Sequence, residues 1–264
     1  MKFLDEVTEI LSLLYKHNWD ERNGGNLSYI LDEEEVWTVC NPNKTIRSFE
    51  YENLDMTPLI GKYFIVTGTG KYFKNCIKDP ENNLGILKIV SARQLDLLWG
   101  YHDGGRMTSE LPTHLLSHIE RLKVDPNHRL VIHCHPTNII AMTHICPLDT
   151  KVITEILWKM QTESIVVFPE GVATLPWMVC GGMEIGIATA EKMKEFRAVI
   201  WAQHGLFCTG TSLDEVYGLI ETIEKAAEIY MKISLHSSYH PISNEDLLKL
   251  AKAFNIKYRK GIID

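Results

Sequence analysis

The apolar positions of the first eighteen residues recur at helical spacing. They are Phe3, Leu4, Val7, Ile10, Leu11, Leu14 and Tyr15. Steps of three and four residues place side chains on one face of an α-helix, so this pattern predicts an amphipathic helix at the start of the chain. The Gly/Asn-rich segment "RNGGN", residues 22–26, predicts a turn after it.

Short runs of branched and aromatic residues follow this turn and are typical of β-strands. The predicted strands are residues 27–31, 36–40, 63–66, 84–90 and 95–101. Because these runs follow one another closely, we expect a sheet built largely from strands that are neighbours in the sequence.

From residue 111 onwards, helical patterns alternate with short apolar runs. The predicted helices are residues 111–122, 139–144, 151–160, 183–196 and 213–235, with a last one that begins near Ser243. The predicted strands are residues 129–135, 165–168 and 198–202. Ser212 and Ser243 stand where N-cap residues are expected, with acids in the following turn. Since no repeat or low-complexity linker interrupts the chain, we expect one mixed α and β domain over residues 1–264.

Composition narrows the class of protein. Hydrophobic residues make up 45% and charged residues 23%, which is ordinary for a soluble globular protein. A net charge of −7 argues against a nucleic-acid-binding surface and means that an anionic substrate must be held by local groups. The six cysteines form no C-x-x-C pair, as expected of reduced thiols in the cytosol. Asp5 and Glu6 interrupt any signal-peptide core, and no apolar run reaches the roughly 18 residues of a membrane span. We therefore expect a cytoplasmic protein that binds neither nucleic acid nor membranes.

Two histidines stand one residue apart in "VIHCHPTN", residues 131–138. In a strand, His133 and His135 point to one face and Cys134 points to the other. Two imidazoles on one face of a rigid strand form half of a metal site; the alternative is a pair of packed strand histidines. His204, which follows the apolar run "AVIWAQ" and precedes Gly205, is a candidate third ligand or the cap of a strand end.

Two further features have both a chemical and a structural interpretation. Glu110, in "MTSELP", is either a functional carboxylate or a first-turn acid behind a Thr/Ser cap. His114 and His118 are four residues apart on a predicted helix, which is a spacing of metal ligands. A hydrolytic site of that kind needs Glu directly after the first histidine, where Leu115 stands, so we predict that this pair lies on the helix surface or in the core.

Two glycine-rich turns have the composition of anion-binding nests. "RNGGN" offers two side-chain amides, and "VTGTGKYF" offers successive backbone N–H groups, the Thr69 hydroxyl and Lys71. Tyr72 stands where a nucleotide P-loop needs Ser or Thr, and Phe73 stands where a dinucleotide fingerprint needs its third glycine. The alternative is two ordinary turns.

Taken together, the segments resemble the class II zinc aldolases of the aldolase/adducin family. The segments are "NWDERNGGNLSY", "FIVTGTGKYFKN", "TSELPTHLLSHIER", "VIHCHPTNIIAMTH", "VVFPEGVATLPWMV", "GIATAEKMK" and "WAQHGLF". The similarity runs from about Asn18 to near Lys232. The wider family includes fuculose-phosphate aldolase, ribulose-phosphate 4-epimerase and the non-enzymatic adducin head domain.

The resemblance implies a fold and a set of site residues. The fold would be a three-layer α/β/α domain with a mainly antiparallel central sheet, assembled as a homotetramer with sites at subunit interfaces. His133, His135 and His204 would bind one Zn²⁺ per subunit. Glu110 would be the catalytic carboxylate, and Glu163 would reach a neighbouring subunit's site. The phosphate and substrate pocket would be formed by Asn23, Gly25, Asn26, Thr69, Gly70, Thr108 and Ser109, with Thr69 standing where the family more often has Ser.

The resemblance also implies an activity. Within the family, the segments are most similar to those of lyases that act in L-rhamnose catabolism. The implied reaction is the zinc-dependent, reversible aldol cleavage of a sugar phosphate, L-rhamnulose 1-phosphate, to dihydroxyacetone phosphate and L-lactaldehyde. At this point two alternatives remain open: an aldolase or epimerase of the same family that acts on another sugar phosphate, and an adducin-like module that has lost the metal.

Overall fold

The computed structural model describes residues 2–236 and 238–264, and its strands form one nine-stranded sheet. The strand order is β2-β5-β4-β3-β1-β6-β9-β8-β7. All neighbouring strands are antiparallel except β7 and β8, which are parallel. The strands are β1 Asn26–Leu31, β2 Arg47–Glu50, β3 Tyr63–Thr67, β4 Leu84–Ile89, β5 Gln94–Gly100, β6 Leu130–Cys134, β7 Ala173–Leu175, β8 Ala198–Trp201 and β9 Gly205–Gly210.

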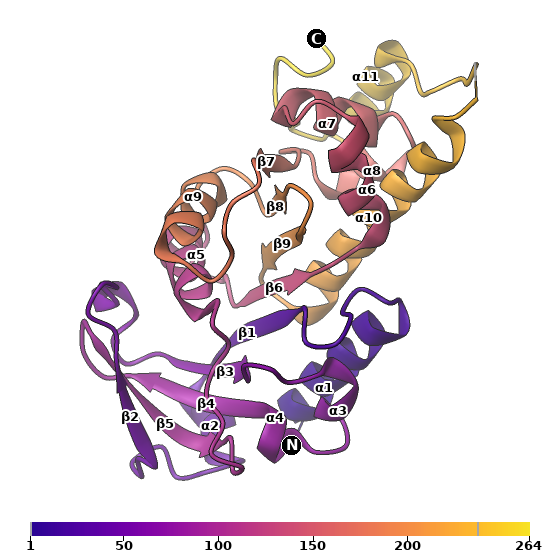
Figure 1. Cartoon of the computed structure of the whole chain (residues 1–264). Coiled ribbons are helices and arrows are strands. Elements are labelled where there is room, and N and C mark those ends of the chain that lie inside the picture. Colours follow the sequence, from indigo (N-terminus) through magenta and orange to yellow (C-terminus); the bar gives the residue numbers. More distant parts are fainter. Residues whose placement is uncertain (1, 237) are drawn as a thin grey trace.

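Helices cover both faces of this sheet (Figure 1). One apolar cluster packs α1, α6, α7 and α10 against one face, and two other clusters pack α5 and α9 against the opposite face. The helices are α1 Lys2–Lys16, α2 Glu33–Trp37, η1 Thr57–Leu59, α3 Phe73–Cys76, α4 Pro80–Asn83, α5 Leu111–Val124, α6 Thr137–Ile145, α7 Thr150–Trp158, α8 Glu163–Val167, α9 Met183–Met193, α10 Leu213–Ile233 and α11 Asn244–Ala253.

The side chains of β6 show how the layers follow from the sequence. Leu130, Ile132 and Cys134 belong to the cluster under α10, whereas Val131 packs on the opposite side with β8 and α9. Strand side chains alternate between faces, so a strand covered on both sides is apolar at successive positions. The expected three-layer fold with a mainly antiparallel sheet is confirmed. No helix in the described part of the chain is long and apolar enough to cross a membrane.

The predicted strand at residues 36–40 is wrong. Helix α2 ends at Trp37, and residues 38–40 form a turn and a bend. Asp32 forms a capping box with Glu35, whose carboxylate accepts the Asp32 backbone N–H at 2.7 Å. This local capping outweighs the β-preference of a short apolar run.

The predicted strand at residues 165–168 is also wrong, because Glu163–Val167 forms the short helix α8. Ile165 is buried there, and the Phe168 carbonyl accepts a hydrogen bond from the Trp158 indole at 3.1 Å. Periodicity cannot separate a strand from one helical turn in a run this short, so tertiary contacts decide.

Three strands were not predicted: β2, β7 and β9. Strand β9 matters most for the site, because it lies between β6 and β8 and pairs Phe207 with His133. The tight connection from β8 to β9 thereby brings residue 204 back beside the end of β6.

Candidate metal centre

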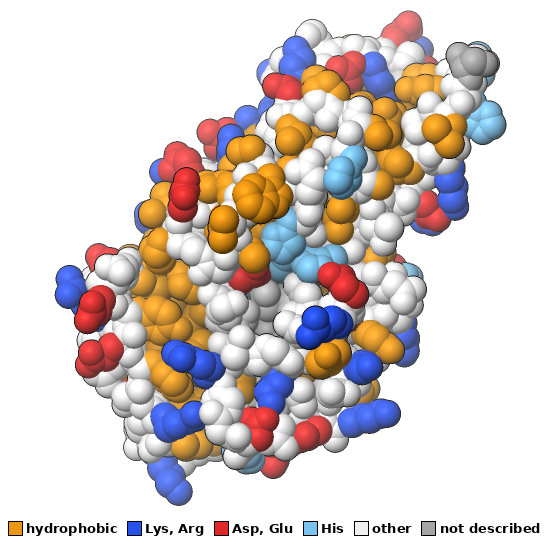
Figure 2. Space-filling view, viewed as in Figure 1, with side chains coloured by type: hydrophobic (Ala, Val, Ile, Leu, Met, Phe, Trp, Pro, Cys, Tyr) orange, Lys and Arg blue, Asp and Glu red, His pale blue; other side chains and the backbone are white. Residues whose placement is uncertain are grey.

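Three histidine side chains from two segments converge at the end of β6. His133 lies on β6, His135 follows one residue after the strand ends, and His204 lies in the connection between β8 and β9. The Nε2 atom of His133 lies 3.2 Å from His135 Nε2 and 3.3 Å from His204 Nε2. Together they form a group able to hold a metal ion. Figure 2 shows histidine side chains gathered near the middle of this face, beside a hollow.

The outer nitrogens of two of these rings have fixed partners. His133 Nδ1 lies 3.1 Å from the Leu206 carbonyl oxygen, and His135 Nδ1 lies 2.8 Å from a Glu21 carboxylate oxygen. Since a carbonyl or carboxylate oxygen only accepts, each Nδ1 carries the proton and each Nε2 presents a lone pair to the centre. Burial holds the pKa of His133 well below its usual range and lowers the pKa of His204 to about 4. Two bare lone pairs that face each other at this distance are stabilised by a cation between them.

Glu21 and the Leu206 carbonyl were missed by sequence reasoning. The Leu206 carbonyl carries no sequence signal. Glu21 lies inside the motif "WDERNGGN", from which only the glycines and asparagines had been selected. Because metal-binding histidines commonly donate their second N–H to a carboxylate, the acids of this motif were candidates for that partner. Another missed neighbour is Cys180, whose thiol lies within 4.8 Å of ligand atoms of Glu110 and His204.

Replacing Glu21 by alanine is expected to lower metal affinity about tenfold. The carboxylate orients the His135 ring, and removal of such a partner typically lowers metal affinity about 10–100-fold. The lower end applies because the Glu21 side chain is 70% exposed. The affinity is measured by competition with a chromogenic chelator, with the exposed Glu52→Ala as the matched control. An unchanged affinity in Glu21→Ala would mean that this contact does not support the site.

Gly24 and Gly205 have no side chains, and His133 and His135 occupy the space where such side chains would lie. A Cβ atom on Gly205 would lie 2.5 Å from the Cys134 carbonyl oxygen and 2.9 Å from ring carbons of both His133 and His135. A Cβ atom on Gly24 would lie 2.6 Å from Cε1 of His135. Only glycine fits at these two positions, because any side chain at either one would displace a candidate ligand.

Glu110 lies at the N-terminus of α5 and faces the histidine group. Its interpretation as a first-turn acid behind a cap is wrong, because Glu110 is itself the N-cap residue and its side chain makes no capping bond. Instead, its carboxylate accepts a hydrogen bond of 2.7 Å from the Asn26 side-chain amide and lies 3.8 Å from His133 Nε2. Burial raises the pKa of Glu110 to about 7. A buried carboxyl with this pKa can accept and return a proton near neutral pH.

The segments predicted to bind phosphate lie next to one another. The Thr69 backbone N–H donates to the Arg106 backbone carbonyl at 2.8 Å, and the Thr108 backbone N–H donates to the Thr67 carbonyl at 3.0 Å. The Thr67 hydroxyl accepts the Leu27 N–H at 3.0 Å, which joins the start of β1 to the same cluster. The three segments therefore meet, and they carry the predicted residues Asn23, Gly25, Asn26, Thr69, Gly70, Thr108 and Ser109.

Asp20 connects the two glycine turns and was not singled out from the sequence. Its carboxylate is buried and accepts the Phe73 backbone N–H at 3.1 Å, while Gly25 lies so close to the Phe73 ring that a Cβ would be 2.7 Å from Cζ. Burial raises the pKa of Asp20 to about 7. Among the predicted pocket residues, Asn23, Thr69 and Ser109 are exposed and free to meet a ligand, whereas Asn26 and Thr108 are buried.

The other residues singled out from the sequence, His114, His118 and Glu163, do not belong to the histidine group. His114 and His118 were predicted to lie on the helix surface or in the core, and both are fully buried on α5. Glu163 is exposed at the start of α8 and does not belong to the possible metal-binding groups among the described residues. All six cysteines are free thiols, as expected.

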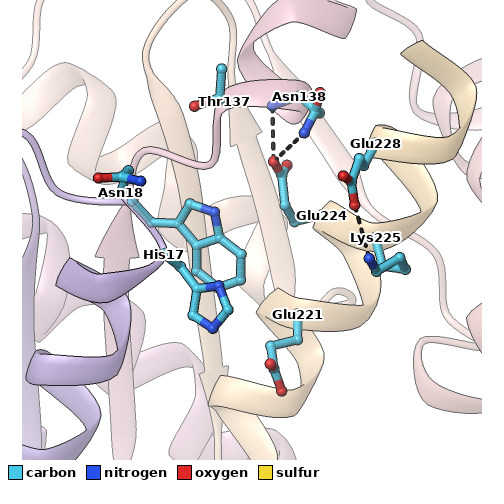
Figure 3. A pocket seen from close by; sticks show the side chains of 9 residues that line it. His17, Asn18, Thr137, Asn138, Glu221, Glu224, Lys225 and Glu228 are labelled. Atoms are coloured by element: carbon cyan, nitrogen blue, oxygen red, sulfur yellow. Dashed lines mark hydrogen bonds and ion pairs between the residues drawn. The ribbon is translucent and has the colours of Figure 1, made fainter. Parts of the chain in front are cut away.

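A separate pocket of about 400 Å³ lies between the loop after α1 and helix α10 (Figure 3). Its most buried carboxylate, Glu224, accepts bonds from the Asn138 backbone and side-chain amides at 2.9 and 2.8 Å and from the Ile139 N–H at 3.0 Å. These bonds hold the N-terminus of α6 immediately after His135. On the other rim, the Trp19 carbonyl accepts the His135 N–H at 2.7 Å. We therefore assign this region the role of supporting the histidine loop.

Comparison with known proteins agrees with this geometry. Residues 5–231 match the model of the class II aldolase and adducin N-terminal domain family, and the chain belongs to that family. The "Rhamnulose-1-phosphate aldolase" of Enterococcus faecalis is 50% identical to it over 264 residues, which cover 99% of this chain and 94% of that protein. The protein of the same name from Listeria monocytogenes serovar 1/2a is 47% identical over 264 residues, 99% of this chain and 96% of that one. The chain is therefore an enzyme, a lyase of the class II, metal-dependent aldolases, and the alternative of a non-enzymatic adducin-like module is wrong.

Solved structures give the same fold. The sugar-phosphate aldolase from Thermotoga maritima superposes with a TM-score of 0.77 at 26% identity, over 90% of this chain and 97% of that one. An L-fuculose 1-phosphate aldolase superposes with a TM-score of 0.62 at 18% identity, over 96% of this chain and 95% of that one. At that identity the second likeness shows the fold alone.

Proposed function

We propose that this enzyme catalyses the zinc-dependent, reversible cleavage of L-rhamnulose 1-phosphate to dihydroxyacetone phosphate and L-lactaldehyde. The observation that supports the reaction class best is the convergence of three histidine Nε2 atoms beside the buried Glu110 carboxylate. The choice of sugar rests on relatives of 44–50% identity that carry the name rhamnulose-1-phosphate aldolase.

The residues of the centre fit zinc. Two nitrogens about 2.0–2.1 Å from a tetrahedral zinc ion are about 3.3 Å apart. The Nε2 separations of 3.2 and 3.3 Å from His133 match this value. We propose that His133, His135 and His204 hold one Zn²⁺ per subunit, whose full double charge is retained because all three ligands are neutral. When bound, zinc supplies the Lewis acid that polarises the substrate carbonyl.

We propose that Glu110 moves the proton at C3 of the substrate. A base takes the proton of the C4 hydroxyl, the C3–C4 bond breaks and its electron pair goes to C3. C3 must then be protonated to give dihydroxyacetone phosphate. Glu110 is buried and is held by Asn26, and its pKa of about 7 suits it to deliver this proton. Binding of the phosphate by the exposed Asn23, Thr69 and Ser109 with the glycine turns would fix the remote end of the sugar.

We also propose that residues 1–264 act as one catalytic domain in a cytoplasmic homotetramer. Glu163 would contribute to the site of a neighbouring subunit, since within its own chain it is exposed on α8 and lies outside the histidine group. This proposal rests on the family resemblance.

Purified enzyme is expected to cleave L-rhamnulose 1-phosphate in a manner that a chelator abolishes and zinc restores. Dihydroxyacetone phosphate is detected with a coupled reductase, and metal content is measured in parallel. L-Fuculose 1-phosphate and L-ribulose 5-phosphate are the comparison substrates. Preference for either of them would replace the proposed sugar, and full activity in the metal-free enzyme would refute the zinc assignment.

A further inference from the structure

A continuous chain of buried polar side chains extends from Glu110 into the core. Behind Asn26 come His114, Ser28, His118, His128 and Thr209, each exposed by 5% or less. The histidine group and Glu110 do not account for these residues, and three of them are imidazoles in an interior where burial of a polar group is costly unless it is hydrogen-bonded.

Secondary structure aligns the members of this chain. Asn26 and Ser28 are two apart on β1 and therefore share a face, while His114 and His118 are four apart on α5 and share a helix face. Across the β1–β6 pair, Asn26 lies opposite His133, so the amide stands directly beside the metal centre. The ring of Phe207 contacts both His114 and His133 and fills the space between them.

The contacts are short throughout. The Ser28 hydroxyl lies 2.7 Å from His114 Nδ1 and 2.8 Å from His118 Nε2. His118 Nδ1 lies 2.8 Å from His128 Nε2, and His128 Nδ1 lies 2.9 Å from the Thr209 hydroxyl. At the other end, His114 Nε2 hydrogen-bonds the Asn26 side-chain oxygen.

When Glu110 is ionised, it sets the direction of the bonds from Asn26 to His128. Because the carboxylate only accepts, Asn26 must turn its NH₂ group to Glu110 and its oxygen to His114. His114 Nε2 must then donate, so its Nδ1 accepts from Ser28. Continuing the same reasoning, His118 and His128 both carry the proton on Nε2. The Thr209 hydroxyl lies 2.9 Å from both His128 Nδ1 and the Leu130 carbonyl oxygen, so its single hydrogen can serve only one of these two acceptors. From Glu110 to the Nε2 atom of His128, every group is satisfied with three neutral rings in one tautomer.

The reverse direction fails when Glu110 is ionised, because a carboxylate has no hydrogen to donate. If His114 carried its proton on Nδ1, its bare Nε2 would require the Asn26 amide to turn its NH₂ group inwards. The amide oxygen would then face the carboxylate oxygen at 2.7 Å, acceptor against acceptor. Burial keeps the pKa of His114 and His128 at about 3 and that of His118 well below its usual range, which favours the neutral rings that this pattern needs.

We propose that His114, supported by Ser28, His118 and His128, is a positioning residue that locks the Asn26 amide and thereby holds the Glu110 carboxylate in place for catalysis. This inference deepens the proposed function and rests on it. We call Asn26, His114, Ser28, His118, His128 and Thr209 the relay. It acts through Asn26 on Glu110, and it contacts neither the Nδ1 atoms of the proposed metal ligands nor the exposed residues proposed to bind phosphate. It should therefore affect turnover and leave both metal content and substrate affinity unchanged.

The test is a double-substitution cycle on the zinc-loaded enzyme. His114→Leu is expected to lower kcat about 10–100-fold, the usual effect of removing an outer partner, with KM and zinc content within about twofold of the wild type. His114→Gln, which keeps a donor for the Asn26 oxygen, is expected to recover most of the lost kcat. Ser117→Ala is the matched control, since Ser117 is buried on the same helix and its hydroxyl has no hydrogen-bond partner in the described chain.

The cycle with Asn26→Ala separates positioning from general loosening of the core. If His114 acts only through Asn26, the double variant is no slower than Asn26→Ala alone, whereas independent effects would multiply and overturn the proposal. Ser28→Ala is a second variant that interrupts the relay, and it removes only a hydroxyl group. If His114→Leu does not fold, the kcat of Ser28→Ala tests the proposal instead. An unchanged kcat in a folded relay variant, or a loss of zinc, would also overturn it.

One readout does not depend on activity. Correlation of histidine ring ¹⁵N and ¹H signals in the wild type, recorded well above pH 7 so that Glu110 is ionised, should show His114, His118 and His128 neutral with the proton on Nε2. A proton on Nδ1 of His114 would overturn the relay even in an active enzyme. An inactive wild type that shows the expected tautomers would instead refute the proposed substrate or reaction and leave the relay standing.

Discussion

Replacement of His133 by alanine is expected to remove bound zinc and cleavage activity together. His133 lies between the other two candidate ligands, because its Nε2 atom is within 3.3 Å of the Nε2 atoms of both His135 and His204. The ring is fully buried, held by the Leu206 carbonyl and stacked on Phe207, so no other side chain can take its place without repacking. Loss of the Lewis acid removes several kcal/mol of stabilisation, so activity should fall by at least about 10³-fold.

The measurement pairs metal analysis with the coupled assay on the same preparation. His240→Ala is the matched control, because His240 is an exposed histidine on the segment between α10 and α11. Since His133 is buried, a circular-dichroism spectrum and a melting curve must show that the variant is folded. A folded His133→Ala enzyme that keeps zinc at wild-type affinity would contradict the assignment of the centre.

Replacement of Glu110 by alanine is expected to abolish turnover while zinc stays bound. The three histidines remain to hold the metal, but the proton at C3 loses its donor. Proton transfer by a positioned side chain is typically worth about 10²–10⁴-fold in rate, and kcat should fall by that amount. Glu110→Gln should lose as much, because its amide oxygen can still accept from Asn26 although the side chain no longer exchanges a proton.

The comparison of the two Glu110 variants separates chemistry from packing. Recovery of activity in Glu110→Gln would show that the carboxylate contributes position and not proton transfer. Glu120→Ala is the control, since Glu120 is an acid on the same helix that pairs with Lys123. Full activity in Glu110→Ala would refute the assigned role altogether.

Local sequence patterns were sufficient to predict most of the helices and strands and two of the candidate metal ligands. The first helix, the strand that carries His133 and the capped helices after Ser212 and Ser243 were predicted because short-range periodicity and capping decide them. Where a run was short, as at residues 36–40 and 165–168, the same reasoning chose a strand and the structure has a helix. Recognition of the whole site came from motifs that resemble a family, and not from periodicity.

The sequence by itself determined that two imidazoles lie close together, because residues two apart at the end of a strand share a face. Only the tertiary structure decided that His204 completes the group, that Glu21 orients His135 and that Glu110 meets Asn26. It also decided that His114 and His118, which as an isolated helical pair resemble metal ligands, are instead hydrogen-bonded to Ser28 on β1. The physical reason is sequence separation: these contacts join residues 71 to 114 positions apart, and strand pairing and helix packing, which no local pattern encodes, bring them within hydrogen-bond distance.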